Sequence, residues 1–167
     1  MLIRAEKERD RDTVFNVNGS AFETPAEATL VDVLREQVQP IVSLVAEDIG
    51  NVVGHIMFSP VLLSGYPDLK VMGLAPMAVA PEYQRKGIGS ALVRSGLEQC
   101  RQLGFVAVVV LGHPEYYPRF GFSPASRFGI DSDYDVPEGV FMALELEPES
   151  LRGKNGRVKY NAAFSNV

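Results

Sequence analysis

The chain has 167 residues, of which 46% are hydrophobic and 22% charged, and its formal net charge is −5 at pH 7. This composition is typical of a soluble globular protein and predicts a single domain over residues 1–167. The negative charge argues against general nucleic-acid binding, and no apolar run is long enough to span a membrane.

The N-terminal part of the chain predicts a short strand followed by two helices. Leu2–Ala5 is apolar enough for an edge strand, and the charged residues around it lack the apolar core of a signal peptide, which predicts a cytoplasmic location. A first helix is predicted over Thr13–Gly19. A second begins after Thr24, which has the spacing of a capping box with Glu27, and ends before Pro40.

Three segments rich in Val, Ile and Leu follow and predict an antiparallel meander. They are Ile41–Ala46, Val52–Phe58 and Lys70–Val79. Proline cannot donate a hydrogen bond to a neighbouring strand, and Pro76 lies inside the third segment. If that strand is central in the sheet, we expect a bulge near Leu74–Pro76.

The next segments predict a helix followed directly by a buried strand. Gly87–Leu103 has helical periodicity, and Gly104 is placed to end the helix. The predicted apolar side of this helix consists of Ile88, Leu92, Val93, Gly96, Cys100 and Leu103. Phe105–Leu111 is a continuous apolar run, which is typical of a strand buried on both faces.

The C-terminal part of the chain has weaker patterns. Gly139–Leu146 predicts a last strand, and its antiparallel edge is a place where a homodimer could form. The tail over residues 147–167 is predicted to be irregular, with Tyr160 and Phe164 available to pack against the rest of the protein.

The segment Gln84–Gly89 joins the third predicted strand to the helix and carries two cations and two glycines. The first N–H groups of a helix have no intrahelical partners, so this position favours an anion such as a phosphate, with Ser90 as a further donor. The segment lacks the complete pattern of a nucleotide P-loop or a dinucleotide fingerprint. From the segment alone, a tight turn with solvated Arg85 and Lys86 is an equal alternative.

Two motifs resemble those of one family. The stretch MAVAPEYQRKGIGSALV is similar to the acetyl-CoA-binding motif of the GCN5-related N-acetyltransferase (GNAT) family, with Gln84, Gly87 and Gly89 at its three motif positions. Phe105–Phe122, FVAVVVLGHPEYYPRFGF, resembles a bacterial subgroup of predicted N-acetyltransferases typified by Leu-Gly-x-Pro-x-Tyr-Tyr-x-Arg-Phe-Gly-Phe. The order of the predicted elements also resembles that of the family over about residues 1–147.

With the predicted elements, the resemblance implies a mixed α/β (α+β) fold with a mostly antiparallel central sheet flanked by helices. Val71–Val79 and Phe105–Leu111 would form a splayed parallel pair of strands. It also implies acetyl-CoA as cosubstrate and an amine acceptor, either a small molecule or a peptide. The implied cofactor-binding residues are Met77, Ala78, Val79, Gln84, Arg85, Lys86, Gly87, Ile88, Gly89 and Ser90.

The resemblance also implies that Tyr117 is the general acid that protonates the departing CoA thiolate. A phenol suits this role because it is protonated at pH 7 and can donate to a developing thiolate. The alternative is a buried aromatic residue whose hydroxyl only satisfies a neighbour. Tyr116 is the adjacent competitor for the same role.

The general base has no clear candidate in the sequence. Val71–Val79 contains no acidic residue, which leaves a bound water, Glu36 or His55. His113 stands where the subgroup usually has an acidic residue, and it is a weaker candidate. Cys100 is the only cysteine and lies on the apolar side of its helix, so we expect neither a metal site nor an acyl-enzyme.

Two other functions are compatible with the sequence. A non-catalytic acyl-CoA-binding module would need no base, and a phosphate- or nucleotide-binding domain would need only the loop. For an acetyltransferase, we expect the N-terminal helices, Ser123–Glu138 and the tail to determine the acceptor.

Overall fold

A nine-stranded sheet runs through the computed structural model, which describes residues 1–166. Its strands are β1 (Leu2–Ala5), β2 (Val42–Asp48), β3 (Asn51–Leu63), β4 (Val71–Val79), β5 (Ala107–Leu111), β6 (Ser123–Pro124), β7 (Ile130–Ser132), β8 (Phe141–Glu145) and β9 (Gly156–Lys159). The order is β1-β2-β3-β4-β5-β8-β6, and β9 joins this path through β3 and also pairs with β7. All pairs are antiparallel except β4–β5 and β7–β9.

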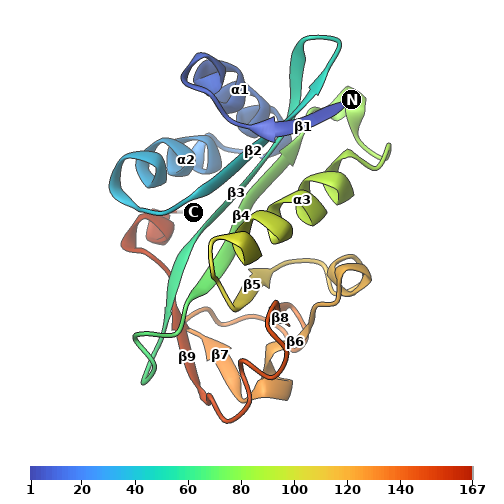
Figure 1. Cartoon of the computed structure of the whole chain (residues 1–167). Helices are drawn as coiled ribbons and strands as arrows, with labels where there is room; N and C mark the ends of the chain where they lie inside the picture. Colours follow the sequence, from blue (N-terminus) through green and yellow to red (C-terminus); the bar gives the residue numbers. More distant parts are fainter. Residues whose placement is uncertain (167) are drawn as a thin grey trace.

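Helices cover both faces of this sheet. The α-helices are α1 (Arg11–Ala21), α2 (Ala26–Gln37) and α3 (Ile88–Gln102), and the 3₁₀ helices are η1 (Glu8–Asp10), η2 (Pro81–Tyr83), η3 (Tyr117–Phe120), η4 (Ala125–Phe128) and η5 (Ala162–Asn166). Figure 1 shows α1 and α2 on one side of the sheet and α3 on the other. The predicted mixed α/β fold with a mostly antiparallel sheet is confirmed.

The residues of β3 contribute alternately to the two cores between sheet and helices. Ile56 and Phe58 pack in the core that includes α3, whereas Met57 packs in the core that includes α1 and α2. This alternation follows from the two-residue period of a strand. Gly96 brings α3 close to the sheet, because a Cβ atom at this position would overlap the Phe58 ring.

The N-terminal predictions are confirmed in kind, with shifted bounds. β1 pairs only with β2 and is an edge strand, and α1 begins before Thr13 and ends after Gly19. The predicted capping box of α2 is wrong. Thr24 Oγ1 accepts a 3.3 Å bond from the Ala26 N–H, but Glu27 Oε2 has no hydrogen-bond partner among the described residues.

The predicted meander is confirmed as β2-β3-β4, and β4 contains the bulge that Pro76 required. Ile56 lies opposite Met77 and Phe58 lies opposite Leu74, so two residues of β4 face one residue of β3 between these pairs. β3 extends five residues beyond its predicted end and stops at Leu63, because it goes on to pair with β9 as well as with β4.

β4 and β5 form the predicted parallel pair, and the pair is splayed. Their pairing is confined to Val71–Gly73 and Ala107–Val109. Beyond these residues the edge of β4 that faced β5 has no strand partner within residues 1–166. Main-chain donors and acceptors at the end of β4 are therefore available to a ligand.

α3 matches its predicted bounds to within one residue at each end. Gly87 precedes it in the left-handed conformation (φ 84°), and Gly104 (φ 88°) follows it. The Phe105 N–H donates to the Cys100 carbonyl at 3.1 Å, which caps the helix end. Leu103 was expected to be buried but is 45% exposed, because it lies past the last helical turn.

The prediction of an irregular C-terminal tail is wrong in part. β9 pairs with Leu62–Leu63 of β3 and with β7, and η5 follows it. Val158 is the one buried residue of this four-residue strand. A single buried residue gives no alternating pattern by which the strand could be predicted from the sequence. The predicted packing of the tail is confirmed, since Phe164 is 6% exposed and contacts the core of α1 and α2.

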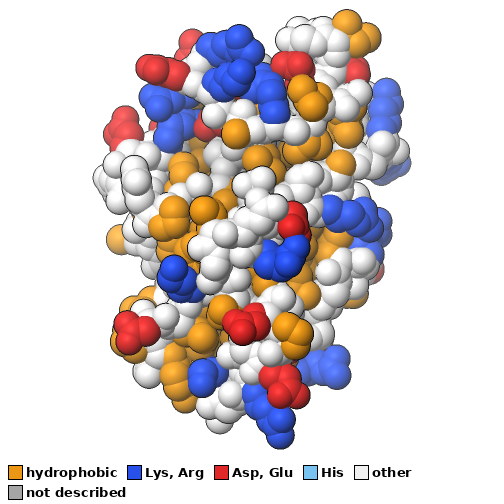
Figure 2. All heavy atoms as spheres, viewed as in Figure 1, with side chains coloured by type: hydrophobic (Ala, Val, Ile, Leu, Met, Phe, Trp, Pro, Cys, Tyr) orange, Lys and Arg blue, Asp and Glu red, His pale blue; other side chains and the backbone are white. Residues whose placement is uncertain are grey.

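The predicted strand Gly139–Leu146 is present as β8, but its outer edge is partly occupied. β8 pairs with β5 along its length, and Met142 and Ala143 also pair with β6. Within residues 1–166, no helix has the length and apolarity needed to cross a bilayer. On the face shown in Figure 2, basic, acidic and apolar side chains are interspersed.

Candidate active site

A cavity of about 550 Å³ lies beside the end of β4 and the first turn of α3; we call it the loop cavity. It is lined by every predicted cofactor-binding residue except Lys86, together with Ala21, Phe22, Tyr83, Tyr116 and Arg119. Lys86 instead places its ammonium 5.5 Å from the centre of the Tyr83 ring. The structure thus brings a loop, a strand end and a helix N-terminus around one space.

The floor of the loop cavity has the geometry of an anion site. The Ala91 N–H donates to the Gly87 carbonyl at 3.1 Å and forms the first turn of α3. The three N–H groups that precede it in the helix have no intrahelical acceptor. Arg85 and Arg119 line the same cavity, so cationic side chains reinforce the positive end of the helix.

Tyr116 belongs to this cavity. Its hydroxyl lies 3.1 Å from Ser90 Oγ, and the Arg119 guanidinium lies 4.4 Å from the centre of its ring. A Cβ atom at Gly89 would be 3.3 Å from the same hydroxyl. Tyr116 is therefore fixed to the first turn of α3.

A second cavity, of about 490 Å³, lies where β4 and β5 separate; we call it the aromatic cavity. Its lining residues are Phe22, Glu27, Leu30, Leu74, Ala75, Pro76, Met77, Leu111, Gly112, His113, Tyr117, Tyr134, Tyr160 and Phe164. Phe22 and Met77 line both cavities. A ligand could therefore extend from the loop cavity along β4 into the aromatic cavity.

Tyr117 lies on the wall of the aromatic cavity and is 7% exposed. Gly112 makes room for it, because a Cβ atom there would overlap the Tyr117 ring. Burial, with a smaller contribution from Tyr116, raises the pKa of Tyr117 to about 12. The phenol is therefore protonated at neutral pH and can act as a proton donor.

The two adjacent tyrosines are in contact but line different cavities. Their rings meet edge to face with centroids 5.1 Å apart. Tyr116 lines only the loop cavity and Tyr117 only the aromatic cavity. The structure thus gives a physical distinction between two residues that the sequence could not tell apart.

Two of the candidate bases lie away from both cavities. His55 is fully buried in β3, and burial together with the charge of Arg35 lowers its pKa to about 3. Its Nδ1 accepts from Asn18 Nδ2 at 3.1 Å, and its Nε2 lies 2.8 Å from Ser43 Oγ. Glu36 is exposed and is not part of either lining, whereas His113 is exposed and does line the aromatic cavity.

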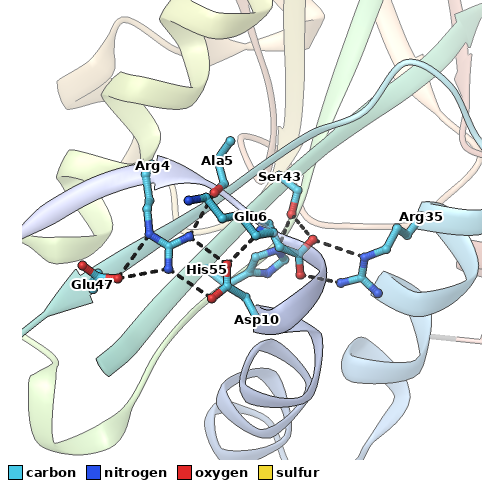
Figure 3. Close-up of polar contacts among 9 residues, drawn as sticks. Arg4, Ala5, Glu6, Asp10, Arg35, Ser43, Glu47 and His55 are labelled. Atoms are coloured by element: carbon cyan, nitrogen blue, oxygen red, sulfur yellow. Dashed lines mark hydrogen bonds and ion pairs between the residues drawn. The ribbon is translucent and has the colours of Figure 1, made fainter. Parts of the chain in front are cut away.

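His55 is part of a polar network that ties the N-terminus to the sheet (Figure 3). Ser43 Oγ donates to Glu6 Oε1 at 2.9 Å, and Glu6 Oε2 pairs with Arg35 at 2.6 Å. Nearby, Arg4 pairs with Asp10 at 2.7 Å, which holds the pKa of that carboxyl below its usual value. These contacts indicate a structural role for His55.

Cys100 is also unsuited to chemistry. It is fully buried in α3, and burial raises its pKa to about 12, so its thiol stays protonated. Among the residues that the structure describes, no group of three or more His, Cys, Asp or Glu side chains is placed to hold a metal ion.

Several residues of the aromatic cavity carried no signal in the sequence. They come from three separate segments, namely the two N-terminal helices, the stretch Ser123–Glu138 and the tail. Glu27 was interpreted only as a helix-capping residue, and Tyr134 belonged to no predicted element. Only the general expectation that these three segments determine the acceptor pointed to them.

Comparisons with known proteins point to one family. The model of the family described as "Acetyltransferase (GNAT) family" matches residues 11–122. The uncharacterised N-acetyltransferase YhbS of Escherichia coli (strain K12) is 38% identical over 166 residues, which cover 99% of each chain.

Two solved structures are similar over almost the whole chain. The structure of YhbS from Escherichia coli in complex with CoA has a TM-score of 0.92 and 37% identity, covering 98% of this chain and 91% of that one. A GNAT-family acetyltransferase from Brucella melitensis in complex with acetyl-CoA has a TM-score of 0.79 and 36% identity, covering 98% and 97%.

Proposed function

The chain belongs to the GNAT family of N-acetyltransferases, and on this premise we propose that it transfers an acetyl group from acetyl-CoA directly to an amine in the aromatic cavity. The observation that carries the proposal is a pair of neighbouring cavities that share Phe22 and Met77 in their linings. One has the features of an anion site, and the other is lined by a protonated phenol, that of Tyr117.

The loop cavity would bind the CoA part of the donor. The pyrophosphate would accept from the first N–H groups of α3, and Arg85 and Arg119 would add charge. The pantetheine arm would pair with the open edge of β4 at Met77–Val79, as an added strand does. The CoA and acetyl-CoA complexes of the two similar structures support this proposal.

The chemistry would proceed without an acyl-enzyme. The nitrogen of the neutral amine attacks the thioester carbonyl carbon, the C–S bond breaks, and Tyr117 donates its proton to the departing thiolate. The attacking nitrogen loses one proton to solvent and Tyr117 regains one from solvent, so that the products are the amide and CoA thiol. The buried, protonated Cys100 supports direct transfer.

Binding of the donor can be tested by calorimetry with acetyl-CoA and the Gly87→Glu variant. The added carboxylate would repel the pyrophosphate and would strain a residue with φ 84°, so binding should be lost. Gly50→Glu is a matched control, because Gly50 is also left-handed (φ 79°) but lies in the β2–β3 turn. Wild-type protein that does not bind acetyl-CoA, or equal loss in the two variants, would contradict the proposal.

A non-catalytic acyl-CoA-binding module is the second candidate function. The absence of any acidic residue from the sequence of β4 favours it, because no base is available on the strand next to the donor. Release of CoA thiol in the presence of a panel of amines separates the two functions. Thiol release with any amine supports the enzyme, and binding without release supports the module.

A further inference from the structure

Glu27 is a partly buried acidic residue on the wall of the aromatic cavity. Its Oε2 atom is buried and has no hydrogen-bond partner in the part of the chain that the structure describes. A carboxylate that is shielded from water and unpaired is unfavourable unless a cation or a donor compensates it. The cavity wall therefore has an acidic side chain with one buried, unpaired oxygen.

Apart from the exposed His113, the remaining wall is apolar and aromatic. Phe22, Leu30, Tyr134, Tyr160 and Phe164 contribute rings or aliphatic groups. Among the described residues that form the lining, Glu27 has the only carboxylate, and none is Lys or Arg. An acceptor with a carboxylate or phosphate would find neither Lys nor Arg in this wall, whereas an apolar body carrying a single ammonium would complement it.

We propose that the acceptor is a primary amine on an aromatic or aliphatic body, and that the Glu27 carboxylate binds its ammonium group. This inference rests on the proposed function, since it assigns the acceptor side of the same site. Aromatic rings around a cation add to the attraction, and the low dielectric of the cavity strengthens the pairing with Glu27.

Glu27 is then the group that receives the proton of the ammonium. The proton moves from nitrogen to the carboxylate, the nitrogen lone pair attacks the thioester carbon, and the C–S bond breaks. Tyr117 protonates the thiolate and is reprotonated by the second proton that the attacking nitrogen loses. Glu27 afterwards releases its proton to solvent, so that the reaction yields the amide, CoA thiol and one proton.

Glu27 also lies in the first turn of α2, where a negative charge interacts favourably with the helix N-terminus. That role predicts a small loss of stability in Glu27→Gln and no change in acceptor kinetics. Glu36→Gln is a suitable control, because it removes the same charge from an exposed position near the other end of the same helix.

The test uses 2-phenylethylamine as the probe, with L-phenylalanine and putrescine as comparisons. L-Phenylalanine has the same ring and amine with an added carboxylate, and putrescine has two ammonium groups and no ring. In thiol-release assays, we expect 2-phenylethylamine to give the highest kcat/KM. Glu27→Gln should lower this value about 10- to 100-fold, as expected for loss of a charged hydrogen bond, and Glu36→Gln should leave it within about twofold.

The pH dependence distinguishes a base from a purely structural residue. The deficit of Glu27→Gln should shrink as the pH approaches the pKa of the amine, because free amine no longer needs a base. The affinity for acetyl-CoA should be unchanged. A faster reaction of L-phenylalanine or putrescine, or an unchanged kcat/KM in Glu27→Gln, would overturn the inference.

Direct calorimetry separates failure of this inference from failure of the proposed function. The CoA-loaded protein is titrated with 2-phenylethylamine. Binding that Glu27→Gln weakens supports the acceptor site even if no thiol is released, in which case only the proposed transfer fails. Thiol release with other amines, without binding of 2-phenylethylamine, overturns the acceptor site alone.

Discussion

Tyr117 and Tyr116 differ in what their hydroxyls can reach. Tyr117→Phe should lower kcat about 10²-fold with little change in the Kd for acetyl-CoA, because it removes a proton donor but no donor-binding contact. Tyr116→Phe removes the contact with Ser90 Oγ and should change the Kd more than kcat. Steady-state kinetics and calorimetry on both variants measure this difference. An equal loss of kcat in the two variants would contradict the assignment.

His55 should make the stability of the protein depend on pH. Its pKa is lowered from 6.5 to about 3 in the fold, so the unfolded chain binds more protons between these values and stability falls as the pH decreases. Between pH 6.5 and 5, this residue alone should cost about 1.5 kcal/mol of unfolding free energy. Urea denaturation at several pH values measures the slope, which His55→Gln should reduce. An unchanged slope in that variant would show that other groups cause it.

At the scale of single residues, the sequence identified those site residues whose role depends on their neighbours along the chain. Gly87 and Gly89 were identified because the motif spacing places them at a helix start, and the structure has them there. Glu27 was missed because its local spacing to Thr24 suggested a cap. Its position in a cavity depends on residues far away in the sequence.

The packing of α3 against β3 depends on the absence of a side chain at Gly96. Gly96→Ala should destabilise the protein by about 1–3 kcal/mol, because the added methyl group would overlap the Phe58 ring. Gly19→Ala in α1 is the control, since a Cβ atom there has no neighbour within 4 Å. It should be neutral or stabilise by up to about 1 kcal/mol. Urea denaturation of both variants tests this, and equal effects would contradict the packing argument.

At the scale of elements, the helices and strands with a clear hydrophobic pattern in the sequence were predicted most accurately. α3 and β5 were placed within two residues because one is clearly amphipathic and the other continuously apolar. β6, β7 and β9 have two to four residues each and were missed. Strands this short have no periodicity, and long-range pairing determines them.

At the scale of the whole molecule, the tail connects stability with the acceptor side of the site. Phe164→Ala should cost about 3 kcal/mol, because Phe164 is a buried residue of η5, which packs against α2. Phe15→Ala, at a residue 37% exposed, should cost less than about 1 kcal/mol. Phe164→Ala should also raise the KM for the acceptor and leave the Kd for acetyl-CoA unchanged. Denaturation and steady-state kinetics measure both effects. A change in the Kd for acetyl-CoA without a change in the acceptor KM would contradict the role of the tail on the acceptor side.

The two cavities also differ in how far the sequence could predict them. The loop cavity is formed mainly by one continuous segment, Met77–Ser90, and all but one of the residues predicted for it line it. The aromatic cavity combines α1–α2, the bulge of β4, η3, Tyr134 and the tail. Tyr117 was predicted from its motif, but the composition of this cavity as a whole depends on the three-dimensional fold.

The position of Tyr160 and Phe164 has a consequence for biosynthesis. The ribosome makes the segment Met77–Ser90 first, and these two aromatic residues of the cavity wall follow it by about 70 residues. A nascent chain therefore has every residue of the loop cavity long before it can close the aromatic cavity. During synthesis, the residues that bind acetyl-CoA should therefore be present before the residues that select the acceptor.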